Sequence, residues 1–439
     1  MVPVSSKHSD ARARPSAPKA KQPAIGWVLI SRAEVAMAEA LLNDRQRGVV
    51  DELGLLSIHQ AFADRLFPGT SVLHTRLRYA LFVPWLMQTA AKAANPVKKL
   101  EQLEFELTGR LKLGLTNNAA SEDDTGIIGS RVYEKGKPAA QPASFSYWSA
   151  LTTWGVLGRD HRHAAPPRES VLDELGSERK TRSAVDLDGQ SLSAGPTYFQ
   201  DLPPQPPALL EDPKGVTFKL LAHERQYLRN RLRSIKAPTL EDETPRESFL
   251  AALARNTVRP LEKTELWDDA AVCACVPKED EDLIDLARHI SALGGIVRAV
   301  YLAFVEQACA DKKYLASRVH REHLNKCRIA WGAEAMKADL EKLVSQRLGL
   351  EHNKLYALLE ATQAWLTTSA ALPKAPVRKL YADLERDRKQ GRARLGGKAG
   401  ASQQLRRWAR SGERASTAGR LHFRWPSVSR LIRDLHEQP

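Results

Sequence analysis

The chain is poor in the features that mark secreted, membrane and β-rich proteins. It has four cysteines in 439 residues, too few for a disulfide scaffold in a chain of this length. No run of about 18 apolar residues stands out as a membrane span, and the first residues lack the apolar core of a secretory signal. Alternating β-branched runs are also scarce, so little sheet is expected. These absences favour a helical protein of the reducing cytoplasm without membrane contact; a transit peptide is the less favoured alternative, because residues 1–25 lack an amphipathic stretch.

Recognisable catalytic motifs are missing as well. The sequence has neither the G-x-x-x-x-G-K-[ST] phosphate loop nor the G-x-S-x-G nucleophile turn. The dense acidic run 279–282 precedes a long apolar stretch that is predicted to be a helix. Acidic side chains are stabilised at the positive end of a helix dipole, so the run is interpreted as structural and not as a catalytic cluster. His320, His323 and Cys327 share a predicted helical face, but a zinc site needs a fourth ligand in tetrahedral array. We therefore expect no cofactor or metal, and favour a protein that is not an enzyme.

Helical periodicity dominates what is present. It predicts a mainly α, multi-helical protein, in which Thr70 or Ser71 begins a helix that Pro84 kinks or ends, and in which Gly294 and Gly295 mark a kink or a close helix contact. Eight of the 25 prolines fall in residues 160–215. The predicted organisation is a disordered basic tail (1–25), an N-terminal helical domain (26–159), a Pro-rich linker (160–215), a C-terminal helical domain (216–373) and a basic C-terminal region packed on that domain (374–439).

Positive charge is concentrated at the carboxyl end. Residues 374–439 hold 17 lysines or arginines against six acidic residues, which is +11 of the net +14 of the whole chain. Because solvated helices normally mix charges of both signs, this imbalance favours contact with a polyanion, and an acidic protein is the alternative partner. Flexible arginines can follow a phosphate backbone, and an exposed indole can stack on bases. The predicted nucleic-acid-binding residues are Arg386, Arg388, Lys389, Arg392, Arg394, Lys398, Arg406, Arg407, Trp408 and Arg410.

A second DNA-binding interpretation concerns residues 143–158, which resemble the second helix of a winged helix in the N-terminal domain. In that interpretation the small polar side chains of the segment contact DNA, and Arg159, Arg162 and His163 lie on a following wing. The contacting side chains are Ser144 or Ser146, Ser149, Thr152 and Thr153. The competing interpretation is a buried helix in which Tyr147, Trp148, Leu151 and Trp154 only pack.

A set of short motifs runs through almost the whole chain. The central one is F-P-G-T-S at 67–71, followed by T-R-x-R-Y at 75–79 and F-V-P-W at 82–85; the closing F-R-W-P stands at 423–426. Arg76 and Arg78 can be interpreted as contacts to a phosphate or to a carboxylate of a partner; in the structural alternative, Arg78 packs on Phe82 and Trp85. The motifs resemble those of an uncharacterised bacterial family of unknown function. The resemblance implies that this chain is an accessory protein of an antiphage defence island, such as a Druantia- or DISARM-like cluster. It implies no catalytic residue.

Together these observations predict an accessory, non-catalytic DNA-binding subunit of a bacterial antiphage defence system. Its expected partners are DNA, taken as double-stranded, and a larger helicase or nuclease on which it docks. Two alternatives stay open: a protein-binding scaffold without nucleic-acid contact, and a cryptic phosphodiesterase or nuclease.

Overall fold

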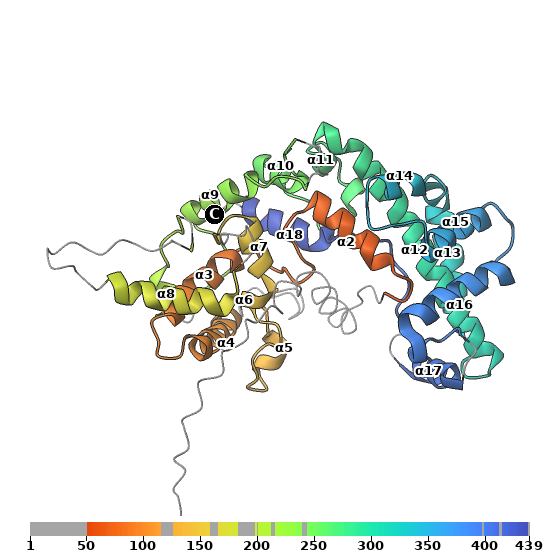
Figure 1. Ribbon diagram of the computed structural model, residues 1–439, viewed down its shortest axis with the longest axis horizontal. Helices are drawn as coiled ribbons and strands as arrows, with labels where there is room; N and C mark the ends of the chain where they lie inside the picture. Colours follow the sequence, from red (N-terminus) through yellow and green to blue (C-terminus); the bar gives the residue numbers. More distant parts are fainter. Residues whose placement is uncertain are drawn as a thin grey trace, which may run out of the picture.

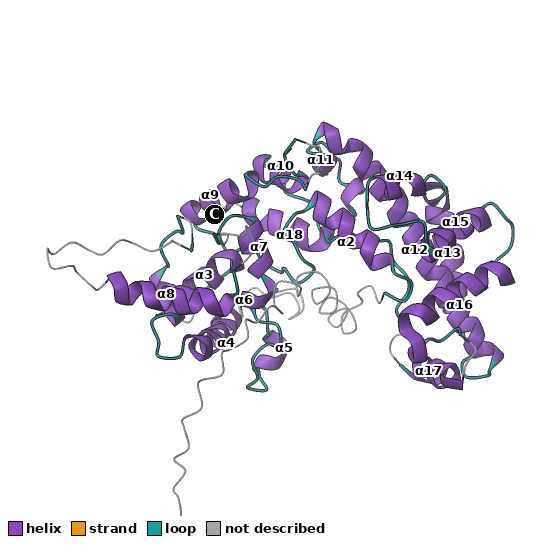
Figure 2. Cartoon of the chain, viewed as in Figure 1, coloured by secondary structure: helices purple, strands orange, loops and turns teal. Residues whose placement is uncertain are grey.

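The structure, a computed structural model, is described for residues 51–115, 126–158, 166–182, 198–199, 201–211, 216–238, 244–396, 399–411 and 415–437. This part of the chain is mainly helical, as the sequence predicts, and its only β pairing consists of two isolated bridges (Figure 2). The α-helices are α2 (Leu55–Leu66), α3 (Tyr79–Ala90), α4 (Pro96–Leu115), α5 (Ser130–Tyr133), α6 (Ala143–Ser146), α7 (Trp148–Thr153), α8 (Arg168–Arg182), α9 (Ala222–Arg233), α10 (Phe249–Arg255), α11 (Ala270–Cys273), α12 (Glu281–Asp311), α13 (Val319–Ala335), α14 (Leu340–Ser345), α15 (Lys354–Leu366), α16 (Ala375–Lys389), α17 (Ala399–Arg410) and α18 (Trp425–His436). Short 3₁₀ turns are η3 (Pro207–Leu209), η4 (Leu266–Asp268), η5 (Lys278–Asp280) and η6 (Gln390–Arg392).

The described helices form an arch (Figure 1). One end of the arch holds α3, α4 and α8, the crown holds α9 to α11, and the other end holds α12 to α17. The last helix, α18, returns to the middle of the arch and packs on α9 and α10. One continuous core of buried apolar side chains extends from Leu53 to Leu435, so both ends of the described chain share it.

The long helix α12 is the spine of the second half. By length and composition the stretch Lys278–Asp311 could cross a membrane, which corrects the expectation that no such segment exists, but 83% of its most apolar window is buried in the protein. Gly294 and Gly295 do not interrupt this helix. A Cβ atom on Gly294 would lie 2.7 Å from the Leu421 side chain, so the glycine pair permits a close approach of residues 420–421. Of the two predicted roles of these glycines, the structure supports the close contact.

The residues between α17 and α18 cross α12 on their way back to the first half of the molecule. The Ser291 hydroxyl donates to the Leu421 carbonyl at 2.8 Å. The Phe423 ring then meets Phe62 of α2, with ring centroids 4.9 Å apart, and the Trp425 ring lies 6.0 Å from that of Phe67. The closing F-R-W-P motif therefore packs directly against the segment that carries the F-P-G-T-S motif.

The T-R-x-R-Y motif forms a junction between distant parts of the chain. The Arg76 guanidinium makes a bidentate ion pair with Asp434 of α18, at 3.0 Å from Nε to each oxygen. Arg78 pairs with Glu224 of α9 at 2.8 Å, and both side chains are buried. The phosphate-contact interpretation of Arg76 and Arg78 is therefore wrong, because both guanidinium groups are engaged inside the protein.

The helix expected from Thr70 or Ser71 begins later, at Tyr79. The Thr70 hydroxyl donates to the Phe67 carbonyl at 2.6 Å, and the Ser71 hydroxyl accepts from the Leu73 amide at 3.2 Å. These local bonds favour turns over a helix in residues 67–74. Pro84 lies inside α3, where the sequence predicted a kink or an end.

Candidate nucleic-acid interface

The three cations at the end of α16 are matched by carboxylates of the same chain. Arg386 forms an ion pair with Asp383 on its own helix at 2.6 Å. Arg388 pairs with Asp51, and the Lys389 ammonium lies 3.1 Å from Glu52. Asp51 and Glu52 precede α2, more than 330 residues away in the chain. These cations therefore join the two halves of the molecule, and their charge is largely neutralised in place.

The arginine-rich loop after α16 is fixed by a buried carboxylate. Glu385 accepts hydrogen bonds from the backbone amides of Arg394 at 2.9 Å and Leu395 at 2.8 Å, and from the Tyr301 hydroxyl at 2.5 Å. The Arg394 side chain lies 3.4 Å from Glu52. Arg392 is exposed in η6, which packs on α17, and Lys398 lies outside the described residues.

Helix α17 is strongly amphipathic, and this sorts its predicted residues into two groups. Leu405 and Trp408 are buried, whereas Arg406, Arg407 and Arg410 are exposed. Trp408 is only 2% exposed, and its ring lies 5.4 Å from that of His320. The expectation that this indole offers an open face to a base is wrong, because the Arg-Arg-Trp-Ala-Arg run is helical and spacing alone turns Trp408 toward the core.

The tertiary structure adds Tyr314 and Lys312 to the candidate site, two residues that sequence reasoning missed. The Arg406 guanidinium lies over the Tyr314 ring, 4.8 Å from its centroid, and Lys312 is exposed just before that ring. A hydrogen bond from Arg406, together with the nearby charges of Arg406 and Lys312, lowers the pKa of the Tyr314 phenol. The Asp-Lys-Lys sequence at 311–313, where α12 ends, was the available signal, but only the packing of α12 on α17 places it beside the arginines.

We call five exposed cations on and around α17 the α17 patch; its members are Lys312, Arg392, Arg406, Arg407 and Arg410. They come from the residue after α12, from η6 and from α17, and α17 contacts both α12 and η6. A Cβ on Gly400 of α17 would lie 3.2 Å from the Gly391 carbonyl, which shows how closely η6 approaches that helix. The predicted cationic site is therefore divided into a paired group on α16 and its loop, and an exposed group on α17 and its neighbours.

The segment expected to resemble a recognition helix is divided into α6 and α7. Ser144, Ser146 and Thr152 are buried, and the Ser144 amide and hydroxyl both donate to Glu104. Tyr147 and Trp154 are buried too, which supports the packing interpretation. Arg159, Arg162 and His163 lie outside the described residues, and no β wing occurs in the part of the chain that is described.

The cysteine and histidine residues of α13 do not form a reactive or metal-binding pair. Cys327 Sγ lies 3.2 Å from His323 Nε2, but that nitrogen also lies 2.7 Å from the Ala418 carbonyl and so carries its proton toward it. Burial raises the pKa of the Cys327 thiol to about 11. His320 instead packs on Trp408, and the described residues contain no group of three side chains able to hold a metal ion.

The acidic run before α12 is likewise structural in the described protein. Asp280 is buried and forms an ion pair with Arg246 at 2.5 Å, rather than accepting from the first amides of the helix. Glu281 and Asp282 lie in the first turn, where they favour the helix dipole.

Comparison with known proteins places this architecture in a family without assigning it an activity. No curated protein and no solved structure matches the chain. The model of a family of unknown function, DUF6361, matches residues 24–438. The chain, including its junction of motifs, its returning α18 and its exposed α17 patch, therefore belongs to the DUF6361 family.

Proposed function

We propose that the protein is a non-catalytic DNA-binding subunit, and that the α17 patch is its DNA contact. The observation that carries the proposal is the exposure of five cations at one end of the arch, while neighbouring cations on α16 are paired with Asp51, Glu52 and Asp383. Cations without an intramolecular carboxylate are the ones that can release counterions from a phosphate backbone.

The patch sets the size of the expected electrostatic signal. If each of its five cations neutralises one phosphate of duplex DNA, the logarithm of the binding constant falls with the logarithm of salt concentration with a slope of about −4.5. Counting all nine predicted cations of the C-terminal region would give about −8. The salt slope therefore separates binding by the exposed group from binding by the whole basic region.

The test compares two triple variants that remove the same charge. In one, the exposed Arg392, Arg407 and Arg410 are replaced by Gln; in the other, the paired Arg388, Lys389 and Arg394 are replaced by Gln. Fluorescence anisotropy with a labelled duplex, titrated at several salt concentrations, measures affinity and slope. We expect the exposed triple to reduce the slope by about 2.7 and the paired triple to leave it nearly unchanged.

Equal effects of the two triples would show that net charge alone drives association, and no effect of either would remove the patch as the DNA contact. Denaturation of both variants provides the folding control, since the paired triple is expected to lower stability. The same preparation, incubated with DNA and Mg²⁺, tests the nuclease alternative, which cleavage by the purified chain would favour.

The second candidate is a protein-binding scaffold, and one surface on α13 favours it. Ile329 is 78% exposed and Met336 50% exposed, and Ala333 lies between them on the same face. The exposed Lys326 and Lys337 stand at the two ends of this stripe. A partner helix with an apolar face and acidic flanks would complement it, and such a contact also suits docking on a larger helicase or nuclease of a defence system.

An Ile329→Glu variant separates the two roles. We expect it to lose co-purification with a co-expressed helicase or nuclease partner while the salt slope for DNA is unchanged. An unchanged co-purification would exclude this stripe as the docking surface. In this proposal both partners are met in the bacterial cytoplasm.

A further inference from the structure

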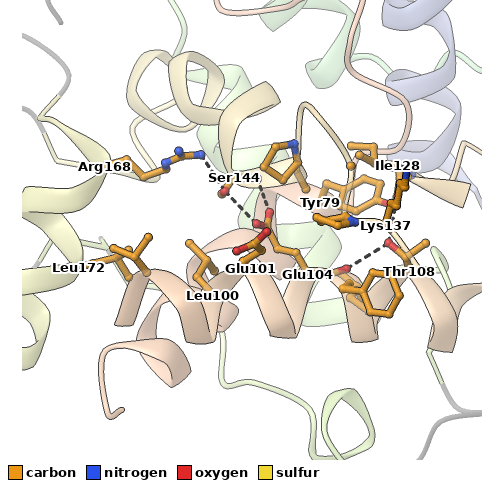
Figure 3. Close-up of a pocket in the computed structure, with 18 of the residues that line it drawn as sticks. Tyr79, Leu100, Glu101, Glu104, Thr108, Ile128, Lys137, Ser144, Arg168 and Leu172 are labelled. Atoms are coloured by element: carbon orange, nitrogen blue, oxygen red, sulfur yellow. Dashed lines mark hydrogen bonds between the residues drawn. The ribbon is translucent and has the colours of Figure 1, made fainter. Parts of the chain in front are cut away.

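A cavity of about 260 Å³ lies at the opposite end of the arch from the α17 patch. Its walls come mainly from α4, from the residues just before α5, from the chain between α5 and α6, from the start of α6 and from α8 (Figure 3). Most of the lining is apolar, including Leu100, Leu107, Ile128, Ala143 and Leu172. Concave and largely apolar sites with a few polar groups are typical of small-molecule binding.

One of the polar groups that line this cavity is the Glu104 carboxylate. Its Oε1 accepts from the Ser144 amide at 2.7 Å, and its Oε2 accepts from the Ser144 hydroxyl at 3.2 Å. Arg168 donates to that same hydroxyl at 3.1 Å, and its positive charge also acts on Glu104 across this short distance. Among the described residues, no lysine or arginine forms an ion pair with Glu104. The two hydrogen bonds to this carboxylate thus come from neutral donors, and the nearest positive charge, that of Arg168, lies beyond Ser144.

The electrostatics of the recess follow from this arrangement. Burial raises the pKa of the Glu104 carboxyl; the two hydrogen bonds from Ser144 and the charge of Arg168 act in the opposite direction, and the neighbouring Glu101, one turn earlier on α4, raises it slightly further. Figure 3 shows Glu101 and Glu104 between Arg168 on one side and Lys137 on the other. A cation that enters between the two basic side chains would meet two carboxylates on adjacent turns, and each carboxylate oxygen has a further lone pair with which to accept a hydrogen bond.

We propose that this cavity binds a small apolar amine, in which a primary ammonium group meets Glu104 and Glu101 and an aliphatic or aromatic stem lies against Leu100, Leu107 and Leu172. The volume suits a molecule of about ten heavy atoms and leaves no room for a folded protein segment. The site shares no residue with the α17 patch, so amine binding can be tested independently of the DNA-binding proposal.

The probe for the test is 2-phenylethylamine, compared with 2-phenylethanol and 3-phenylpropanoate, which keep the ring but replace the ammonium by a neutral or an anionic group. Calorimetry with the full chain measures all three. We expect the amine to bind at least tenfold more tightly than the alcohol, and the acid to bind most weakly. Equal binding of amine and alcohol, tighter binding of the acid, or no heat of binding from the amine at millimolar concentration would each overturn the proposal.

Two variants and a control locate the site. Glu104→Gln keeps the shape of the side chain and one acceptor for Ser144, and is expected to weaken amine binding at least tenfold. Val97→Trp changes a rim residue that is 48% exposed and fills the entrance while Glu104 remains, so it should also weaken binding. Glu106→Gln, on the same helix but outside the cavity lining, should leave binding unchanged. If Glu104→Gln folds and binds the amine as the native protein does, the proposed recognition is wrong.

Discussion

Replacing Glu224 by Gln should destabilise the protein far more than an average substitution. Glu224 is fully buried, and its Oε1 accepts from Arg78 at 2.8 Å while its Oε2 accepts from the Leu221 amide at 3.0 Å at the start of α9. Arg78 has only one other hydrogen-bonded group, the Thr217 carbonyl at 2.8 Å, and its Nε is buried without a partner in the described protein. The guanidinium therefore depends on this one carboxylate for its countercharge.

The expected magnitude follows from what the substitution leaves behind. Gln has one carbonyl oxygen, so it can accept from Arg78 or from Leu221, and its amide nitrogen then faces the other donor. Breaking one partner of a buried ion pair typically costs about 3 to 5 kcal/mol, because the remaining charge stays buried and uncompensated. We expect Glu224→Gln to lower the free energy of unfolding by about 3 kcal/mol or more.

The assay is urea denaturation at pH 7, followed by far-ultraviolet circular dichroism. The matched control is Glu262→Gln, which removes the ion pair with Arg433 at a position where the Glu262 side chain is 70% exposed. Exposed pairs contribute about 0 to 1 kcal/mol, so the control should change little. A Glu224→Gln effect as small as that of the control would refute the reasoning that the T-R-x-R-Y motif is a buried structural junction.

A double-mutant cycle isolates the pair itself. Arg78→Met removes the charge while keeping an apolar stem beside Phe82, over whose ring the guanidinium now lies at 5.3 Å. The double variant should be less destabilised than the sum of the single ones, with a coupling energy of about 2 kcal/mol. Additive effects would mean that the two side chains do not depend on each other.

Two further predictions concern strain and pH. Gly349 has φ +74°, and a Cβ there would lie 2.3 Å from the Ser57 carbonyl oxygen, whereas a Cβ on Gly136, which has φ +64°, would have nothing within 4 Å. In denaturation experiments, Gly349→Ala should therefore lower the free energy of unfolding by about 3 kcal/mol or more, and Gly136→Ala by only about 1 to 2 kcal/mol. Equal losses of stability in the two variants would contradict the predicted clash. Burial lowers the pKa of His74 to about 3 and that of His422 to about 4, so the unfolded chain takes up these protons first as the pH falls below 6.5. The contribution of these histidines to the free energy of unfolding should be fully present above pH 6.5 and decline toward pH 4, with a loss of about 2 kcal/mol for each histidine at pH 5. The His422→Asn variant should lack the part of this decline that comes from His422. If the variant declines as much as the native protein, the pH dependence comes from other groups.

Much of the fold was readable from local pattern. The spacing of apolar residues predicted the helical class, and the apolar stripe of α12 followed directly from residues such as Leu286, Ile290 and Val297, which are buried as their spacing requires. The same periodicity, applied to α17, would have placed Leu405 and Trp408 on one face and the arginines on another. The exposed Trp408 was thus an error of interpretation and not a limit of the sequence.

The candidate site could be predicted only in part from the sequence. Charge along the chain identified the basic region, and its count needs no structure. A count over neighbouring residues cannot show, however, that Asp51 and Glu52 lie against Arg388 and Lys389, because those partners are separated by 337 residues. Nothing in the sequence predicted the cavity at Glu104, because its walls come from segments that only the packing of α4, α6 and α8 brings together.

The sequence alone determined that this protein is helical, where its charge is concentrated and which short motifs it carries, because these properties depend on residue type and on spacing within a few turns. The tertiary structure decided which arginines are exposed, what the motif residues do and where a cavity forms. The physical reason is that burial and ion pairing depend on the surroundings of a side chain in space, and in this chain the surroundings of Arg76, Arg388 and Glu104 are supplied by residues far away in sequence.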